Sequence, residues 1–285
     1  MNYDAILLTS FGGPEAPDEV MPFLERVTAG RGVPRERLAE VEHHYLELGG
    51  VSPINAQNRA LLAAMREVFP RRGINLPIYW ANRNSEPYFD DVLRTMHAEG
   101  HRHVLAWVTS AYSSYSGCRQ YRENLAAALQ ATGLQDELTI DKVRHYFDHP
   151  GFIAPMAEDL SNRLSEFKQQ GLGASDVRIL FATHSIPTAM AKTSGPEARR
   201  EEFALVDSEG GAYAAQHLAA AEAVMAAAHG ILNDVLPEWE LVYQSRSGSP
   251  SVPWLEPDVN DAISSCARSG AKGVIVVPVG FVSDH

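Results

Sequence analysis

Short apolar runs that stop at polar loops recur along the chain and predict β-strands. They form pairs that follow one another in the same order in the two halves. The paired segments are AILLTSFGGP and RILFATHSIP (5–14 and 178–187), PIYWANRNSEP and ELVYQSRSGSP (77–87 and 240–250), and HVLAWVTSAYSS and GVIVVPVGFVSD (103–114 and 273–284). Runs of this length are typical of strands buried on both faces of a parallel sheet. The repeated order indicates an internal duplication of the fold.

Amphipathic and alanine-rich segments between these runs predict helices. One is expected at 15–29, where Pro14 and early acidic residues suit a helix N-terminus. Others are expected over 55–69, about 118–131 and 213–230, the last of which ends at a glycine. Strands that alternate with helices predict parallel sheets joined by right-handed crossovers. We therefore expect an α/β fold of two doubly wound, Rossmann-like halves.

The repeat predicts a domain boundary near the middle of the chain. The N-terminal domain would span 1–150 and the C-terminal domain 151–285, joined near DHPGF (148–152). The first half continues past its third strand into a helix and a strand-like segment at 138–147, whereas the second half stops at His285. We therefore expect the second domain to be incomplete by a helix and a strand, and the 285-residue chain to be poorly stable.

Composition and charge narrow the classes of protein. Hydrophobic residues make up 45% and charged residues 21%, which is typical of a globular protein. The net charge of −12 argues against nucleic acid or an anionic membrane surface as the main partner. The N-terminus lacks the basic region of a signal peptide, and no apolar stretch approaches the roughly 20 residues of a membrane span. Cys118 and Cys266 provide no disulfide framework, so we expect a reducing, cytoplasmic location and no stable membrane anchor.

Side chains directly after the predicted strands mark the candidate site, because ligands of such sheets bind beyond the carboxyl ends of the strands. The residues at these positions are Phe11, Arg83, Ser110, His184, Arg246 and Asp284. His184 follows a buried strand and precedes Pro187, which stops the strand from continuing. An imidazole there can accept a proton or bind a borderline metal, although the position also suits an ordinary turn residue. His285, after the third strand of the second half, is a further candidate.

Other motifs have ordinary structural explanations. In GGVSPINAQ (49–57), Ser52 precedes a helix and suits an N-cap turn. The segment AYSSYSGCRQYREN (111–124) could hold a carboxylate or a flat ring, or could be a polar surface loop. His217 and His229 lie in a predicted helix and are expected to pack or to face solvent. The histidines show no zinc-ligand spacing, and neither a GxGxxG nor a Walker motif occurs.

In several of the motifs described above, the chain resembles the ferrochelatases. The motifs that carry the resemblance occur in the family's order and are LLTSFGGPE, GGVSPIN, ATHSIP, YQSRSG, WLEPDV and GFVSDH. The resemblance runs from the N-terminus to the last residue, and AYSSYSGCRQYREN is similar to the actinobacterial enzymes of the coproporphyrin-dependent route to haem. It implies an enzyme that inserts Fe²⁺ into a porphyrin, with coproporphyrin III favoured over protoporphyrin IX.

The resemblance also implies roles for individual residues. His184 matches the family's histidine in HS[LI]P, which implies metal binding and proton acceptance. Ser52 and Tyr121 match positions that contact porphyrin propionates, and Tyr45 matches a tyrosine beside the same pocket. The family's catalytic glutamate stands two residues after the histidine of SDHxE. That glutamate would lie beyond His285, so we do not expect the 285-residue chain to be active by itself.

Three positions depart from the family pattern. Phe11 replaces a tyrosine that binds product iron in some relatives, and a phenyl ring cannot ligate iron. His44 stands where related enzymes often carry arginine. Cys118 matches one ligand of the [2Fe–2S] cluster that some ferrochelatases hold, but a cluster needs four ligands and the sequence adds only Cys266. A cluster would therefore require a cysteine-bearing C-terminal extension.

Two alternatives from other classes stay open at this point. One is a module that holds haem or porphyrin without inserting metal, which the missing glutamate favours for this chain. The other is a cobalt or nickel chelatase of the same fold, whose members usually carry more cleft histidines. Insertion assays with Fe²⁺, Co²⁺ and Zn²⁺ on two porphyrins would separate the three hypotheses.

Overall fold

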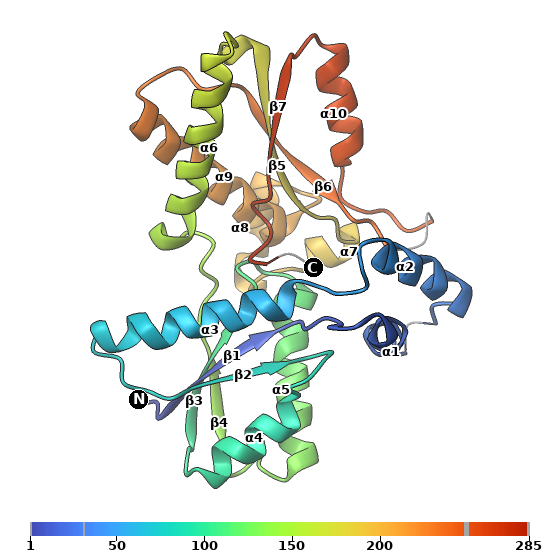
Figure 1. The fold of residues 1–285 in the computed structure, drawn as a ribbon, viewed down its shortest axis with the longest axis vertical. Coiled ribbons are helices and arrows are strands. Elements are labelled where there is room, and N and C mark those ends of the chain that lie inside the picture. The colour runs from blue at the N-terminus through green and yellow to red at the C-terminus, as the bar shows by residue number, and fades with distance from the viewer. Residues whose placement is uncertain (1, 31, 248–250, 284–285) are drawn as a thin grey trace. The chain divides into compact units, whose positions relative to one another are not determined.

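The computed structural model describes residues 2–30, 32–247 and 251–283, and it shows an α/β protein with two parallel sheets (Figure 1). The first sheet has the strand order β2-β1-β3-β4 and the second β6-β5-β7, and every pairing is parallel. The strands are β1 (Ala5–Ser10), β2 (Ile78–Asn82), β3 (His103–Val108), β4 (Thr139–Lys142), β5 (Val177–His184), β6 (Trp239–Gln244) and β7 (Gly273–Val277). The predicted fold class of two parallel, doubly wound halves is confirmed.

The chain folds into two units, each built around one sheet. Unit 1 contains residues 2–110 and 119–144, together with 282 and 283. Unit 2 contains residues 111–118 and 145–281. The two units therefore interleave along the chain, and the division at residue 150 stays a prediction.

In unit 1 the alternation of side chains along β1 sends apolar groups to both faces of the sheet. Ile6 and Leu8 pack against α3, whereas Ala5 and Leu7 pack against α4 and α5. A leucine buried in this way contributes roughly 1.5–3 kcal/mol to folding. The helices of unit 1 are α1 (Val20–Val27), α2 (Arg35–Glu47), α3 (Ile54–Arg71), α4 (Phe89–Ala98) and α5 (Gln120–Thr132).

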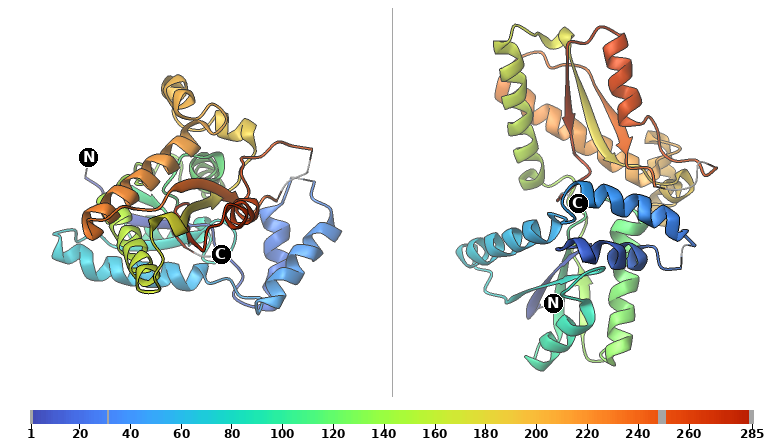
Figure 2. Two further views of the ribbon diagram at one scale, coloured as in Figure 1. Left: turned by 90° about the horizontal axis from the view of Figure 1, so that it is seen from above. Right: turned by 45° about the vertical axis from the view of Figure 1, so that its right-hand side comes forward.

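In unit 2 the central strand β5 is likewise buried on both faces. Ile179 and Phe181 face the core formed with α6 and α9, and Leu180 and Ala182 face α10. The helices on the two faces of this sheet can be followed in Figure 2. The helices of unit 2 are α6 (Pro150–Gln169), α7 (Thr188–Lys192), α8 (Arg200–Val206), α9 (Gly211–Leu232) and α10 (Val259–Arg268). Both faces of the sheet are therefore covered by helices, as a parallel sheet requires.

Most predicted helices occur within a few residues of the expected ranges. The segments 55–69 and 213–230 correspond to α3 and α9, and 118–131 corresponds to α5 after a π-helical turn at Tyr115–Arg119. The segment 15–29 differs, because a 3-10 turn at Pro17–Glu19 precedes α1. Pro17 takes the first position of this 3-10 turn, where a missing N–H costs nothing, and α1 begins three residues later at Val20.

The internal repeat is visible in the sheet order and in one of its registers. β1 is the first strand of the first half and β5 is the first strand of the second half, and each has a neighbouring strand on both sides. β3 pairs with β1 in the same register as β7 pairs with β5. Ala5 lies opposite Val104, and the repeat-equivalent Arg178 lies opposite Val274. The sequence alignment of these two pairs of segments is therefore confirmed.

The alignment of 77–87 with 240–250 is displaced by two residues. Ser10 lies opposite Asn82, whereas its equivalent Thr183 lies opposite Tyr243. Matching main-chain bonds support this, because Asn82 N donates to Pro87 O at 2.7 Å and Tyr243 N donates to Pro257 O at 2.9 Å. Asn82 is therefore the counterpart of Tyr243, and Arg83 is the counterpart of Gln244 rather than of Arg246.

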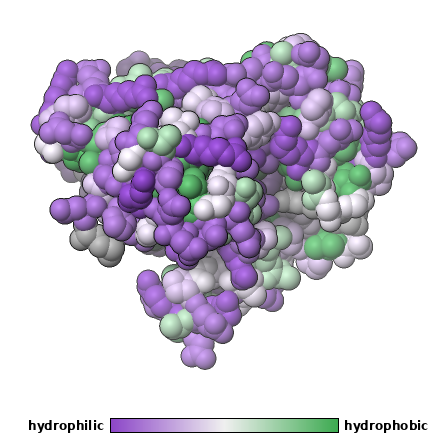
Figure 3. Space-filling view, turned by 90° about the horizontal axis from the view of Figure 1, so that it is seen from below, coloured by the Kyte–Doolittle hydropathy of each residue, from purple (hydrophilic) through white to green (hydrophobic). Residues whose placement is uncertain are grey.

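One face of the protein is mainly polar. The face in Figure 3 carries mostly hydrophilic side chains, with hydrophobic groups in small separate areas. Within the described part of the chain, no helix combines the length and apolar character needed to cross a bilayer.

Candidate active site

His184 is the last residue of the central strand of the unit 2 sheet, and it lies half-buried at the strand's carboxyl end. Directly after it, Ser185 donates its main-chain N–H to Gln244 O at 2.7 Å and its hydroxyl to Leu255 O at 2.9 Å. Pro187 then caps the N-terminus of α7 with a φ of −55°. These bonds and the proline turn the chain away from the sheet, which leaves the imidazole at the sheet edge.

The imidazole of His184 is suited to bind a metal or accept a proton. Burial lowers its pKa below the ordinary value, so the ring is neutral at pH 7. Among residues 2–30, 32–247 and 251–283, none forms a side-chain hydrogen bond with that ring. A neutral ring keeps a nitrogen lone pair for a borderline divalent metal or for a proton.

Two side chains that the sequence did not single out contact the end of β5. Tyr213, in the first turn of α9, donates its hydroxyl to the main-chain oxygen of His184 at 2.8 Å. The same hydroxyl lies 2.9 Å from Oγ1 of Thr183, and both residues are buried. The alanine-rich pattern predicts α9 but contains no signal that places its first turn over β5.

In unit 1, the side chain of Arg83 connects two aromatic residues near the ends of the strands. Arg83 follows β2 directly, and its guanidinium carbon lies 4.8 Å from the ring centroid of Tyr121 and 5.4 Å from that of Phe11. Its Nε donates to Oδ1 of Asn124 at 2.9 Å. A cation held against aromatic faces near the ends of β1 and β2 can attract an anionic ligand.

Tyr121 and Tyr45 provide neutral hydroxyls in the same part of unit 1. Burial raises the pKa of Tyr121 to about 12 in spite of the nearby Arg83, and burial raises the pKa of Tyr45 to about 12. Tyr45 packs edge-on against Phe23 at 6.4 Å between ring centroids, and Phe23 lies 6.1 Å from Phe11. Tyr45, Phe11 and Tyr121 are thus linked through Phe23 and Arg83 into one group.

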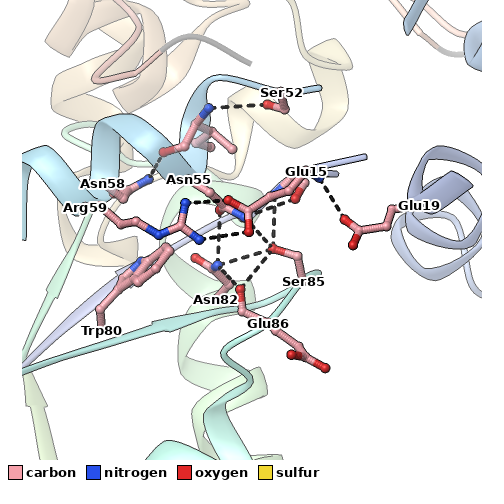
Figure 4. Close-up of polar contacts among 12 residues, drawn as sticks. Glu15, Glu19, Ser52, Asn55, Asn58, Arg59, Trp80, Asn82, Ser85 and Glu86 are labelled. Atoms are coloured by element: carbon pink, nitrogen blue, oxygen red, sulfur yellow. Dashed lines mark hydrogen bonds and ion pairs between the residues drawn. The ribbon is translucent and has the colours of Figure 1, made fainter. Parts of the chain in front are cut away.

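Ser52 is buried at the start of α3 (Figure 4). Its Oγ accepts a long hydrogen bond of 3.4 Å from the main-chain N–H of Ile54. Gly13 packs tightly against it, because a Cβ on Gly13 would lie 2.6 Å from the Cβ of Ser52. The helix N-cap is Pro53, so Ser52 lies one residue before the observed cap and not at the cap position itself.

A polar network around Asn82 ties the strand ends of unit 1 to α3 (Figure 4). The amide nitrogen of Asn82 donates to Oδ1 of Asn55 at 3.2 Å and to the main-chain oxygen of Glu86 at 2.9 Å. The hydroxyl of Ser10 donates to Oδ1 of Asn82. Asn55 in turn donates to the main-chain oxygen of Gly13 at 3.1 Å. The network fixes the loop that carries Gly13, against which Ser52 packs.

The other predicted positions are spread over both units. His44 is exposed on α2, Arg246 is exposed after β6, and Ser110 is half-buried after β3. Asp284 and His285 lie outside the described residues. The structure therefore groups Phe11, Arg83, Tyr45 and Tyr121 in unit 1 and keeps His184 with unit 2.

The cysteines do not fit a four-thiolate cluster. Cys118 is half-buried in the π-helical turn, whereas Cys266 is buried on α10 in the core that contains Leu180 and Val242. Within the part of the chain that the structure describes, no group of three or more His, Cys, Asp or Glu side chains could hold a metal ion. These residues supply at most one accessible thiol.

Comparisons with known proteins identify the family to which the chain is similar. The chain matches the family model named Ferrochelatase over residues 3–285. It is 54% identical over 286 residues to the coproporphyrin III ferrochelatase of Leifsonia xyli subsp. xyli, covering 99% of this chain and 72% of that protein. It is 52% identical over 290 residues to the coproporphyrin III ferrochelatase of Streptomyces griseus subsp. griseus, covering 99% and 73%. A ferrochelatase of Rhodopirellula baltica is 49% identical over 287 residues, again covering 99% and 73%.

Proposed function

The chain belongs to the ferrochelatase family, whose members insert Fe²⁺ into porphyrins in haem biosynthesis, and we propose that its porphyrin substrate is coproporphyrin III. The observation that carries this choice is the substrate in the names of the relatives that are 52–54% identical over 99% of the chain. Protoporphyrin IX is the competing substrate, and the test below distinguishes the two.

His184 is the proposed metal ligand and proton acceptor. Insertion removes two pyrrole protons and strips water from Fe²⁺, so it needs a neutral base that can also bind a divalent metal. The lowered pKa of His184 keeps its ring neutral, and its half-buried place at the end of β5 leaves the ring in reach of a substrate. Ferrous iron is a substrate here and not a resident cofactor.

The propionates are the proposed ligands of the group formed in unit 1. Tyr45, Tyr121 and Ser52 offer hydroxyls, and the guanidinium of Arg83 adds a positive charge. A hydrogen bond to a charged group contributes roughly 1.5–3 kcal/mol. Coproporphyrin III carries four propionates and protoporphyrin IX two, so a site rich in such donors favours coproporphyrin III.

Two further features of the protein are predicted from its cysteines. A cytoplasmic location follows from the low cysteine content of the sequence. Cys118 would serve as one ligand of a [2Fe–2S] cluster only if other cysteines joined it, because Cys266 is buried in the core.

The test is a substrate matrix under anaerobic conditions. The protein, expressed from its complete gene, is mixed with Fe²⁺, Co²⁺ or Zn²⁺ and with coproporphyrin III or protoporphyrin IX. Insertion is followed by the change in the visible absorption bands of the porphyrin, because zinc porphyrins remain fluorescent. We expect the highest kcat/KM for Fe²⁺ with coproporphyrin III. A higher kcat/KM with protoporphyrin IX would refute the substrate, and binding of porphyrin without any insertion would support a non-catalytic tetrapyrrole-binding module.

A further inference from the structure

A closed ring of hydrogen bonds lies beneath the end of β5. It is formed by Thr183, Tyr213 and His217, which are buried with exposed fractions of 0%, 6% and 0%. Oγ1 of Thr183 lies 2.9 Å from the hydroxyl of Tyr213 and 2.9 Å from Nε2 of His217. Nδ1 of His217 lies 2.7 Å from the main-chain oxygen of Tyr213, which closes the ring. All three residues belong to unit 2.

The chemistry of the partners determines the direction of each bond. A carbonyl oxygen only accepts, so Nδ1 of His217 carries a proton and donates to Tyr213 O. In a neutral imidazole Nε2 is then an acceptor, and the Thr183 hydroxyl donates to it. The Thr183 proton is used towards His217, so the single proton of the Tyr213 hydroxyl is shared between the main-chain oxygen of His184 at 2.8 Å and Oγ1 of Thr183 at 2.9 Å.

His217 is held in this tautomer by its surroundings. The ring of Tyr112 stacks on it with 3.6 Å between ring centroids and 13° between the ring planes. The Tyr112 hydroxyl donates to Val279 O at 2.8 Å, which fixes the stacking ring. Burial lowers the pKa of His217 to about 3, so the imidazole is neutral at pH 7 and acts through hydrogen bonds.

The packing around Thr183 leaves little room for movement. A Cβ on Gly280 would lie 2.0 Å from Oγ1 and 2.8 Å from Cα of Thr183. The main-chain N–H of Gly280 donates to Ala182 O at 3.2 Å, so this glycine lies directly against the strand end. The ring therefore holds both Thr183, through its side chain, and His184, through its carbonyl oxygen.

We propose that Thr183, Tyr213 and His217 are positioning residues that hold the backbone of His184, so that its imidazole meets the entering Fe²⁺ in a fixed place. This inference rests on the proposed role of His184 in iron insertion. The three residues do not touch the reacting atoms. They act through the end of β5, where a displacement of about 1 Å can reduce a rate by as much as about a hundredfold.

The test compares two substitutions at one position. Thr183→Val keeps the shape but removes the hydroxyl, which breaks the bonds to Tyr213 and His217. Thr183→Ser keeps the hydroxyl and serves as the matched control. In the protein expressed from its complete gene, we expect Thr183→Val to lower kcat/KM for Fe²⁺ by about tenfold or more, with Thr183→Ser within about twofold of the parent protein. The Kd for coproporphyrin III, from fluorescence titration, should change less than about twofold in both variants.

A spectroscopic arm does not depend on activity. Histidine side-chain ¹H–¹⁵N correlation spectra should show His217 with its proton on Nδ1, and the signals of His184 should shift in Thr183→Val but not in Thr183→Ser. If Thr183→Val fails to fold, Tyr213→Phe takes its place in this measurement. It removes only the hydroxyl bonded to His184 O, and it should shift the same His184 signals.

The two ways of being wrong can be told apart. Unchanged His184 signals and unchanged iron kinetics in Thr183→Val would overturn the positioning role while leaving iron insertion by the parent protein intact. A parent protein that inserts no iron would refute the proposed function, whereas its spectra would still report whether the ring orders His184.

Discussion

The two units place different chemistry at equivalent strand ends. In unit 1 the central strand ends at Ser10 and is followed by Phe11, while in unit 2 the repeat-equivalent residues are Thr183 and His184. Ser10 bonds to Asn82 on the neighbouring strand, whereas Thr183 bonds to Tyr213 and His217 on a helix. The two units repeat the same fold, but the side chains at the carboxyl ends of their equivalent strands differ. One end presents aromatic rings, hydroxyls and a guanidinium, and the other presents an imidazole.

The largest expected difference between the two ends is their response to acid. Burial lowers the pKa of His217 to about 3, and a histidine in an unfolded chain titrates near pH 6.5, at about its ordinary value. Below about pH 6.5 the unfolded chain therefore binds a proton that the folded chain does not, so stability is lost as the pH falls towards 3. The network around Asn82 is built from amides and hydroxyls, which do not titrate. Glu15, which bonds to Asn55, has its pKa lowered chiefly by its bond to Arg59, so this carboxylate stays ionised below its ordinary titration range.

Urea unfolding at pH 7 and pH 4.5 measures this difference. We expect His217 to account for a loss of about 2–3 kcal/mol in the free energy of unfolding between the two pH values. The non-titrating variant His217→Gln should lack this part of the loss, although it is less stable at pH 7. Equal losses in the parent protein and in His217→Gln would contradict the account.

The next prediction concerns the unit 1 end, which we expect to control porphyrin affinity and not iron handling. Replacing Ser52 with Ala and Tyr121 with Phe together removes two hydroxyl donors. Binding of coproporphyrin III should weaken by about tenfold or more, and binding of protoporphyrin IX should weaken less, because a hydrogen bond to a charged group contributes roughly 1.5–3 kcal/mol. Fluorescence titration with both porphyrins is the measurement. Equal losses for the two ligands would remove the assignment of these hydroxyls to propionates.

A smaller difference in stability is expected between alanine substitutions at two repeat-equivalent positions, one after β3 and one after β7. The repeat pairs Ser110 of unit 1 with Gly280 of unit 2, where an added Cβ would lie 2.0 Å from Oγ1 of Thr183. Gly280→Ala should therefore lower the free energy of unfolding by about 1–3 kcal/mol, the usual cost of overpacking. Ser110→Ala, the matched control, should stay within about 0.5 kcal/mol. Thermal melts of both variants test this, and a Gly280→Ala protein as stable as the control would show that Thr183 is free to move.

The strands and their repeat could be predicted because a strand in a parallel sheet is a continuous apolar run that ends at a loop. β1 and β5 are buried along almost their whole length, so local sequence was sufficient. The position of His184 at a strand end followed from the same pattern. The two-residue displacement of β6 could not be predicted, since register depends on pairing with β5 and not on the apolar run itself.

The hydrogen-bonded ring next to His184 could not be predicted from the sequence for a related reason. His217 was expected to pack or to face solvent, and it does pack, but its bond to Thr183 depends on how α9 lies over the sheet. The contact spans 34 positions along the chain, and no spacing rule links a helix residue to a strand residue over that distance. Likewise, the contacts of Arg83 with Phe11 and Tyr121 join three separate elements.

The most direct test of the account is iron insertion by His184→Ala in the protein expressed from its complete gene. The control is His229→Ala, which removes an exposed histidine from the far end of α9 in the same unit. We predict that His184→Ala loses measurable insertion of Fe²⁺ into coproporphyrin III while its porphyrin Kd stays within about threefold, and that His229→Ala matches the parent protein. Near-normal turnover in His184→Ala would contradict the central claim that the imidazole at the end of β5 performs the chemistry.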